Sequence, residues 1–181
     1  MAHSLPSRAC LTAQYNTAHQ RPWADASTRY KPIPLFNMIS YNTINVKMPD
    51  ISHRETTAWV RAVAASYNKR VGEVAYVFCD DEKILEVNRQ YLKHDYYTDI
   101  ITFDYCEGDV LSGDLFISLD TVRTNAEQFG KTYDDELHRV IIHGILHLVG
   151  INDKGPGERE IMEAAENKAL ALLDQMRHAQ D

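Results

Sequence analysis

Two histidines that lie four residues apart in an apolar stretch constrain this chain more than any other feature. His143 and His147 belong to residues 140–150, in which nearly every other side chain is apolar. A spacing of four places both imidazoles on one face of a helix, one turn apart. A helix that is apolar all round is buried, and buried imidazoles need polar partners. One divalent metal ion satisfies both rings, so the sequence predicts a metal-binding helix in the core.

A third ligand is expected just beyond this helix. Gly150 offers a helix end, because glycine readily adopts the left-handed conformation that closes helices. Past that turn, Asp153 is the first residue with a metal-binding side chain that is not an amide. We therefore predict that His143, His147 and Asp153 hold one metal ion with its fourth position open. Three protein ligands and an open position are typical of a catalytic zinc site.

The residue after the first histidine separates this chain from the helical zinc peptidases. Those enzymes carry H-E-x-x-H, in which the Glu is the general base, whereas Gly144 occupies that position here. The missing carboxylate argues against ordinary peptide hydrolysis. An HxxxH pair that only packs or caps a helix is the simpler alternative; the buried setting, the glycine and the following carboxylate favour the metal.

Length, charge and cysteine content define the class of protein. The 181 residues suit one domain with a sizeable core, and the formal net charge is −7. Such an acidic chain is not an obvious electrostatic binder of nucleic acid, so an RNA partner would be held by local basic groups and the metal. Three cysteines at uneven spacing (Cys10, Cys79 and Cys106) indicate reduced thiols in a cytosol rather than a disulfide framework. No apolar run approaches the roughly 20 residues of a membrane span.

The first 37 residues differ from the rest. They contain four of the six prolines and no amphipathic period, so we expect a disordered extension over residues 1–37. Met38 opens the ordered part and is a candidate translation start. Residues 38–181 are predicted to form one metallohydrolase domain.

Apolar periodicity and capping residues divide this domain into a mixed α+β order. The predicted strands cover residues 42–47, 74–79, 99–105 and 114–119. The first predicted helix begins after Ser52, which has capping-box spacing to Glu55, and is expected to end at Gly72. A second helix is predicted after Asp80 or Asp81, through Leu92, and a third from Asp120 to near Gly130. The metal helix begins at Thr132, and the last helix begins at Pro156. We expect one small sheet of about four strands packed with helices.

Three segments together resemble a known family. They are Asn88-Arg-Gln-Tyr91 with Thr98-Asp-Ile-Ile-Thr-Phe103, then Gly113-Asp114, and then His143-Gly-x-Leu-His147-Leu-x-Gly150. From Met38 onward the chain is similar to the bacterial YbeY family of rRNA maturation factors, which are metal-dependent, single-strand-specific endoribonucleases. The resemblance implies a zincin-like α+β fold, one Zn²⁺ per chain, and a cytoplasmic role in 16S rRNA 3′-end processing and ribosome quality control. The implied partners are single-stranded RNA and the small ribosomal subunit, with neither DNA nor membrane.

Two positions depart from the family pattern. Most members have a third histidine where Asp153 stands here, which preserves a ligand but changes the charge of the site. The family's arginine after N-x-x-Y is replaced by Leu92. The nearby Arg89, Lys93 and His94 are candidates to supply the missing positive charge to the substrate.

Other polar residues are expected to be mainly structural. Thr98, Asp99 and Asp114 are read as turn and capping residues, although Asp99 or Asp114 would also suit a hydrogen bond to a metal-bound histidine. His138, five residues before His143, lies on another face of the helix and is predicted to be a surface or packing residue. Lys69 and Arg70 suit a solvated helix end.

The reaction that fits these features is phosphodiester cleavage in single-stranded RNA. Attack by a zinc-activated water and attack by the neighbouring 2′-OH both remain open, and no glutamate at position 144 is available as a base. A zinc peptidase is the alternative enzyme. A ribosome-assembly factor with a structural metal, whose fourth position a further ligand such as Glu158 would close, is the alternative without enzymatic activity.

Overall fold

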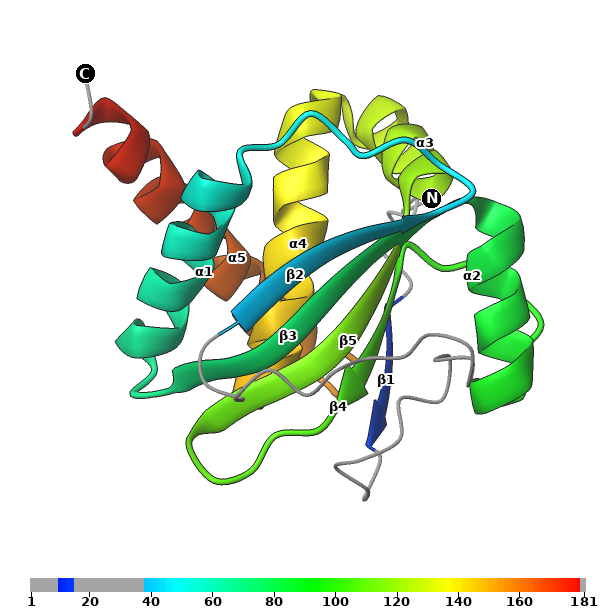
Figure 1. The fold of residues 1–181 in the computed structure, drawn as a ribbon, viewed down its shortest axis with the longest axis horizontal. Helices are drawn as coiled ribbons and strands as arrows, with labels where there is room; N and C mark the ends of the chain where they lie inside the picture. Colours follow the sequence, from blue (N-terminus) through cyan, green and yellow to red (C-terminus); the bar gives the residue numbers. More distant parts are fainter. Residues whose placement is uncertain (1–9, 15–37, 180–181) are drawn as a thin grey trace.

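A five-stranded sheet covered by helices organises the part of the chain that is described, residues 10–14 and 38–179 of a computed structural model (Figure 1). The strands are β1 (Cys10–Gln14), β2 (Met38–Ile44), β3 (Arg70–Cys79), β4 (Ile100–Asp104) and β5 (Val110–Ser118). The helices are α1 (His53–Ser66), α2 (Asp81–Val87), α3 (Leu119–Phe129), α4 (Tyr133–Val149) and α5 (Glu158–His178), with a π-helical turn, η1 (Asn88–Leu92), after α2. The predicted α+β class is confirmed.

The strand order is β1-β4-β5-β3-β2, and β4 runs antiparallel to β5 while every other pair is parallel. Residues from 38 onward supply the four strands expected. The fifth strand, β1, comes from the segment predicted to be disordered, and it pairs along β4 from Cys10 with Ile100 to Gln14 with Asp104. The rest of that segment lies outside the described residues.

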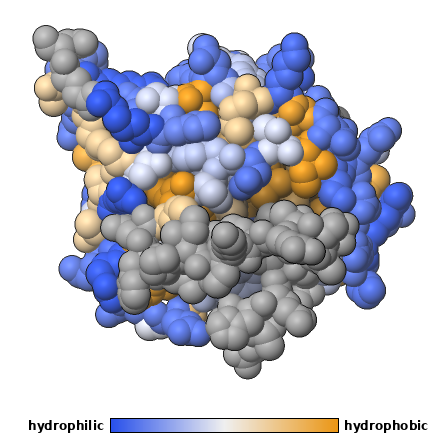
Figure 2. Space-filling model, in the orientation of Figure 1, coloured by the Kyte–Doolittle hydropathy of each residue, from blue (hydrophilic) through white to orange (hydrophobic). Residues whose placement is uncertain are grey.

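The two faces of the sheet pack against different helices. The sheet has one apolar core on each face, and successive residues of β3 point into them alternately. Tyr76 and Phe78 belong to the core formed with α1, α4 and α5, whereas Val77 belongs to the core formed with α2. Figure 2 shows apolar residues among the polar side chains of the face in view. The helix α4 is buried along most of its length, as its apolar sequence predicted. None of the described helices has the length and apolar character to span a bilayer.

Side-chain caps set the helix starts, and most were predictable. Ser52, Asp80 and Thr132 each accept a hydrogen bond from the backbone amide three residues ahead. The expected cap at Asp120 was wrong, because Ser118 caps α3 through the amide of Thr121. Pro156 also precedes the last helix rather than opening it, since Gly157 is its N-cap.

Several strand and helix boundaries differ from those predicted. The strands expected to begin at residues 74 and 114 begin earlier, at Arg70 and Val110. The strand predicted at residues 42–47 is β2, which begins at Met38 and ends at Ile44, before Asn45 at a positive φ of 63°. Gly72 lies inside β3 rather than ending α1, at a shift in the pairing with β5 where a Cβ would come within 2.6 Å of Ser112 Oγ. The helix predicted to run through Leu92 changes to π-helical geometry at Asn88.

Removal of residues 1–37 is expected to leave a chain that folds and binds metal. Among the side chains whose burial is described, the apolar residues of both cores lie between residues 39 and 176, and the described contact that the truncation removes is the β1–β4 pairing. We expect cooperative thermal unfolding of the chain that begins at Met38, with unchanged metal content by mass spectrometry. Loss of cooperative unfolding in that variant would show that the extension is part of the core.

Candidate metal centre

The helix that carries the two histidines is fixed at both ends. Thr132 caps its start, and acidic side chains in the first turn suit the positive end of the helix dipole. Gly150 closes it with a φ of 107°, and the backbone amides of Gly150 and Ile151 donate to the carbonyls of His147 and Leu146. This left-handed closure turns the chain back, so that Asp153 faces the helix it follows.

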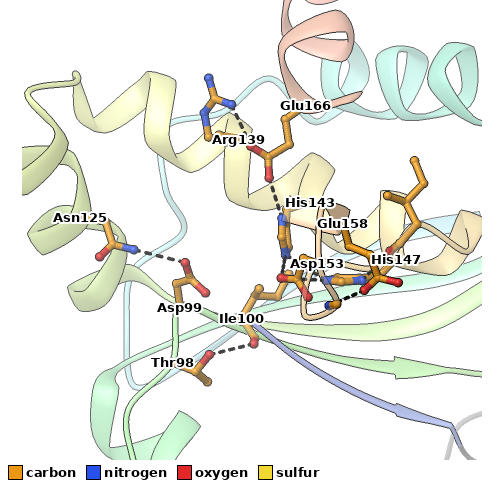
Figure 3. Close-up of polar contacts among 12 residues, drawn as sticks. Thr98, Asp99, Ile100, Asn125, Arg139, His143, His147, Asp153, Glu158 and Glu166 are labelled. Carbon is orange, nitrogen blue, oxygen red and sulfur yellow. Dashed lines mark hydrogen bonds and ion pairs between the residues drawn. The ribbon is translucent and has the colours of Figure 1, made fainter. Parts of the chain in front are cut away.

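The three predicted ligands meet at one point (Figure 3). His143 Nε2 and His147 Nε2 are 2.9 Å apart, and Asp153 Oδ2 lies 3.6 Å from the first and 3.8 Å from the second. Ligand atoms around a tetrahedral zinc ion, each about 2.0–2.2 Å from the metal, are roughly 3.3 Å apart. The donor set therefore fits one zinc-sized ion with a position left for water or substrate.

Hydrogen bonds at the far side of each ring decide which nitrogen faces this point. His147 Nδ1 donates to the carbonyl oxygen of Ile151 at 2.9 Å, and His143 Nδ1 donates to Glu166 Oε1 at 2.6 Å. In the neutral rings, both Nε2 atoms are then acceptors, and they lie 2.9 Å apart. Two acceptors 2.9 Å apart repel unless a proton or a cation lies between them. A bound metal ion removes this conflict.

Burial keeps the second histidine neutral. Desolvation, followed by the charge of His143, lowers the pKa of His147 to about 4, despite the opposing effect of Asp153. A metal ligand must be the neutral imidazole, so this shift favours metal binding at neutral pH. The centre lies within the helix-packed core, and the side chains of both histidines are 5% exposed.

This pKa shift gives a pH-dependent stability for the metal-free protein. In the unfolded chain histidine titrates near 6.5, so between about pH 6.5 and 4 the unfolded state binds more protons at His147. The contribution of His147 to the free energy of unfolding is therefore complete above pH 6.5. It is lost as the pH falls towards 4, by up to about 1.4 kcal/mol per pH unit. Thermal melts of metal-free protein across this range should show the decline. His147→Gln should flatten it, and an equal slope in that variant would contradict the assignment.

Glu158, considered as a fourth ligand, has another contact. Its Oε2 accepts a hydrogen bond from the backbone amide of Gly155 at 2.6 Å, and this bond fixes the loop that carries Asp153 (Figure 3). Among the described residues, the group of side chains close enough to share an ion consists of His143, His147 and Asp153.

Asp99 and Asp114 were considered as hydrogen-bond partners of the two histidines, but both carboxylates bond to other side chains. Asp99 Oδ2 accepts from Asn125 Nδ2 at 3.2 Å, and Asp114 Oδ2 accepts from the Tyr105 hydroxyl at 3.2 Å. The Nδ1 atoms of the two histidines are already bonded to other groups, as described above. His138 is a packing residue, since it is buried and its ring lies 5.9 Å from that of Trp59.

Of the three candidate substrate contacts, Arg89 lies in the first part of η1, and Lys93 and His94 lie in the exposed loop that follows it. Arg89 Nε is 2.5 Å from Asp95 Oδ1, and Lys93 adopts a left-handed backbone with a φ of 60°. His94 stacks on Tyr96, with ring centroids 5.3 Å apart. The positions are solvent-exposed, as a substrate contact requires, and their role in binding stays a prediction.

Glu166 is the site residue that the sequence reasoning missed. It lies on α5 among buried apolar residues and is 2% exposed. A carboxylate at a position that shares the apolar stripe of Met162, Ala165, Ala169 and Leu173 was the available signal. Buried acids are rare unless paired, so this position called for a cationic or histidine partner.

The fold and the site together define a class of metallohydrolase-like proteins. The domain is mixed α+β, its buried helix carries His-x-x-x-His, and a carboxylate follows on the next turn. The lack of a glutamate beside the first histidine separates this class from the helical zinc peptidases. Comparison with known proteins narrows this class to one family. The family model described as Endoribonuclease YbeY matches residues 39–174, and the chain belongs to this family.

Relatives of the same name agree with this assignment, and a solved structure shares the fold. Endoribonuclease YbeY of Bacteroides thetaiotaomicron is 81% identical over 134 residues, which cover 74% of this chain and 98% of the relative. The Porphyromonas gingivalis protein of the same name is 55% identical over 135 residues, covering 75% of this chain and 89% of the relative. The solution structure of TM1509 from Thermotoga maritima has a TM-score of 0.58 at 25% identity, over 79% of this chain and 93% of the other.

Proposed function

We propose that this chain is a zinc-dependent endoribonuclease that cleaves single-stranded RNA. On this proposal it matures the 3′ end of 16S rRNA and takes part in ribosome quality control in the cytoplasm, with the small ribosomal subunit as partner. Its membership of the Endoribonuclease YbeY family supports the reaction class. The observation that carries the metal is the pair of Nε2 acceptors 2.9 Å apart beside the Asp153 carboxylate.

The residues of the site divide the work of such a reaction. A zinc ion bound here would act as a Lewis acid on the phosphodiester and would activate the attacking water or hydroxyl group. His143 and His147 present their Nε2 atoms because their Nδ1 protons are held by Glu166 and Ile151. Asp153 adds one negative charge to the ligand set, which lowers the net charge of the site relative to three histidines. Gly144 brings no carboxylate to the position of the peptidase base.

Cleavage assays with matched substrates test the reaction. Zinc-loaded protein should cut an end-labelled single-stranded RNA, leave the same sequence intact as duplex RNA or as single-stranded DNA, and lose activity with a chelator. A 2′,3′-cyclic phosphate at the product end would identify the 2′-OH as the nucleophile. Cleavage of casein by the same preparation would support the peptidase instead, and stoichiometric metal without cleavage of either substrate would support an assembly factor.

The third ligand is tested by substitutions at Asp153. Asp153→Ala should lose metal, because two histidines alone bind weakly, and Asp153→Asn should bind it more weakly than the wild type, because the amide oxygen is neutral. Asp153→His should retain it. Metal content and affinity measured by mass spectrometry and chelator competition compare these variants. Wild-type affinity in Asp153→Asn would assign the third ligand to another residue.

A further inference from the structure

A line of three charged or polar groups leads from the proposed metal centre to the outer side of α4 (Figure 3). His143 Nδ1 donates to Glu166 Oε1 at 2.6 Å, and Arg139 Nη1 donates to the other carboxylate oxygen, Oε2, at 2.8 Å. The side chains of His143, Glu166 and Arg139 are 5%, 3% and 14% exposed. Glu166 thus bridges two residues that stand one turn apart on α4.

The bridging carboxylate is placed to control the orientation and basicity of His143. A carboxylate that accepts the Nδ1 proton fixes the tautomer, holds the ring plane and makes Nε2 a stronger donor to a metal. The short, buried contact strengthens this effect, because charged hydrogen bonds are stronger where water is excluded. His147 differs, since its Nδ1 donates to the neutral carbonyl of Ile151.

Arg139 neutralises the charge of the buried Glu166 carboxylate and fixes the orientation of its oxygens. An unpaired carboxylate at this depth would be strongly destabilising, and the guanidinium next to it supplies the opposite charge. A second contact, from Arg139 Nη2 to Asn167 Oδ1 at 2.8 Å, fixes the guanidinium plane. With Oε2 held by Arg139, the other oxygen of Glu166 faces His143.

We infer that Glu166 is a positioning residue for the metal, and that Arg139 acts on the metal only through Glu166. The inference rests on the zinc site proposed above. It adds Glu166 and Arg139 as residues that support the metal ligands without touching RNA. It assigns a role to the one buried acid on α5, which joins the last helix of the domain to the metal centre.

Metal affinity, measured by competition with a chromogenic chelator, tests this role without relying on activity. Glu166→Gln should weaken zinc binding by about 10–100-fold, the range found when outer partners of metal-bound histidines are removed. It should also shift the visible absorption bands of the cobalt-substituted protein. The matched control is Glu163→Gln, the same change at an exposed position of α5, which should alter neither. Melting temperatures of the metal-free variants separate these effects from a general loss of stability.

A double-mutant cycle tests the part assigned to Arg139. Arg139→Met alone should weaken zinc binding several-fold, but it should have no further effect in the Glu166→Gln background, because its action passes through that carboxylate. Additive losses would overturn the role of Arg139. If Glu166→Gln does not fold, Arg139→Met alone decides, and wild-type affinity in that variant overturns the inference.

Failure of this inference differs from failure of the proposed site. Wild-type affinity and an unchanged cobalt spectrum in folded Glu166→Gln would overturn the positioning role while leaving the zinc site standing. Absence of stoichiometric metal in the wild-type protein would overturn the zinc site, and the positioning role with it.

Discussion

Replacement of His143 or His147 by alanine is expected to abolish stoichiometric zinc and RNA cleavage together. Each ring supplies one of three ligand atoms, and loss of a direct ligand should exceed the roughly 10–100-fold cost of losing an outer partner. Bound metal also contributes to folding free energy, so the melting temperature should no longer rise when zinc is added. Metal content, chelator competition and cleavage of labelled single-stranded RNA measure these effects.

His138→Ala is the matched control for this experiment. His138 lies on the same helix and is equally buried, but its ring packs against Trp59. Its removal should lower stability while leaving metal content unchanged. Full cleavage activity in a metal-free His143→Ala or His147→Ala protein would disprove the metal-dependent mechanism.

Gly144→Ala is expected to destabilise the protein strongly despite the high helix propensity of alanine. A Cβ at this position would lie 2.1 Å from Leu115 Cδ2 and 2.8 Å from Ile100 Cδ1. Such overpacking typically costs about 1–3 kcal/mol, and each kcal/mol lowers the melting temperature by roughly 2–4 °C in a domain of this size. Thermal denaturation compares the variant with the wild type; an unchanged melting temperature would contradict the packing described.

A compensating substitution tests whether the clash is the cause. Leu115→Val shortens the side chain that the new methyl group would meet, so Gly144→Ala should cost less in that background. Gly144→Glu places a still larger, charged side chain in the same space. We therefore expect a poorly folded protein without peptidase activity, even though the substitution recreates the H-E-x-x-H pattern.

The order of strands and helices was predictable because its determinants are local. Capping residues such as Ser52 and Thr132, and the apolar period of α4, act within a few residues of the elements they specify. Two of the errors arose where a distant strand decides. Gly72 resembles a helix terminator in sequence, but the close approach of Ser112 in β5 makes it a strand glycine. The pairing of β1 with β4 likewise depends on a partner far along the chain.

The candidate metal centre likewise contains residues that local spacing predicts and one residue that only distant packing reveals. His143, His147 and Asp153 could be selected from spacing, because one helix and one glycine turn bring them together. Glu166 could not be assigned to His143 from spacing, since that contact requires the packing of α5 on α4. In the structure the Nδ1 atoms of His143 and His147 bond to Glu166 and to the Ile151 carbonyl, and not to Asp99 or Asp114 as was considered from the sequence.

The closure of α4 at Gly150 bears on the order in which the protein folds. All three ligand atoms come from residues between His143 and Asp153, whereas the parallel pairing of β3 with β5 joins Arg70 to Val110. Closing a short loop costs less entropy than closing a long one, and local contacts form faster than distant strand pairs. We therefore expect the helix and turn that carry the three candidate ligands to form from local contacts, ahead of the pairing of the distant strands.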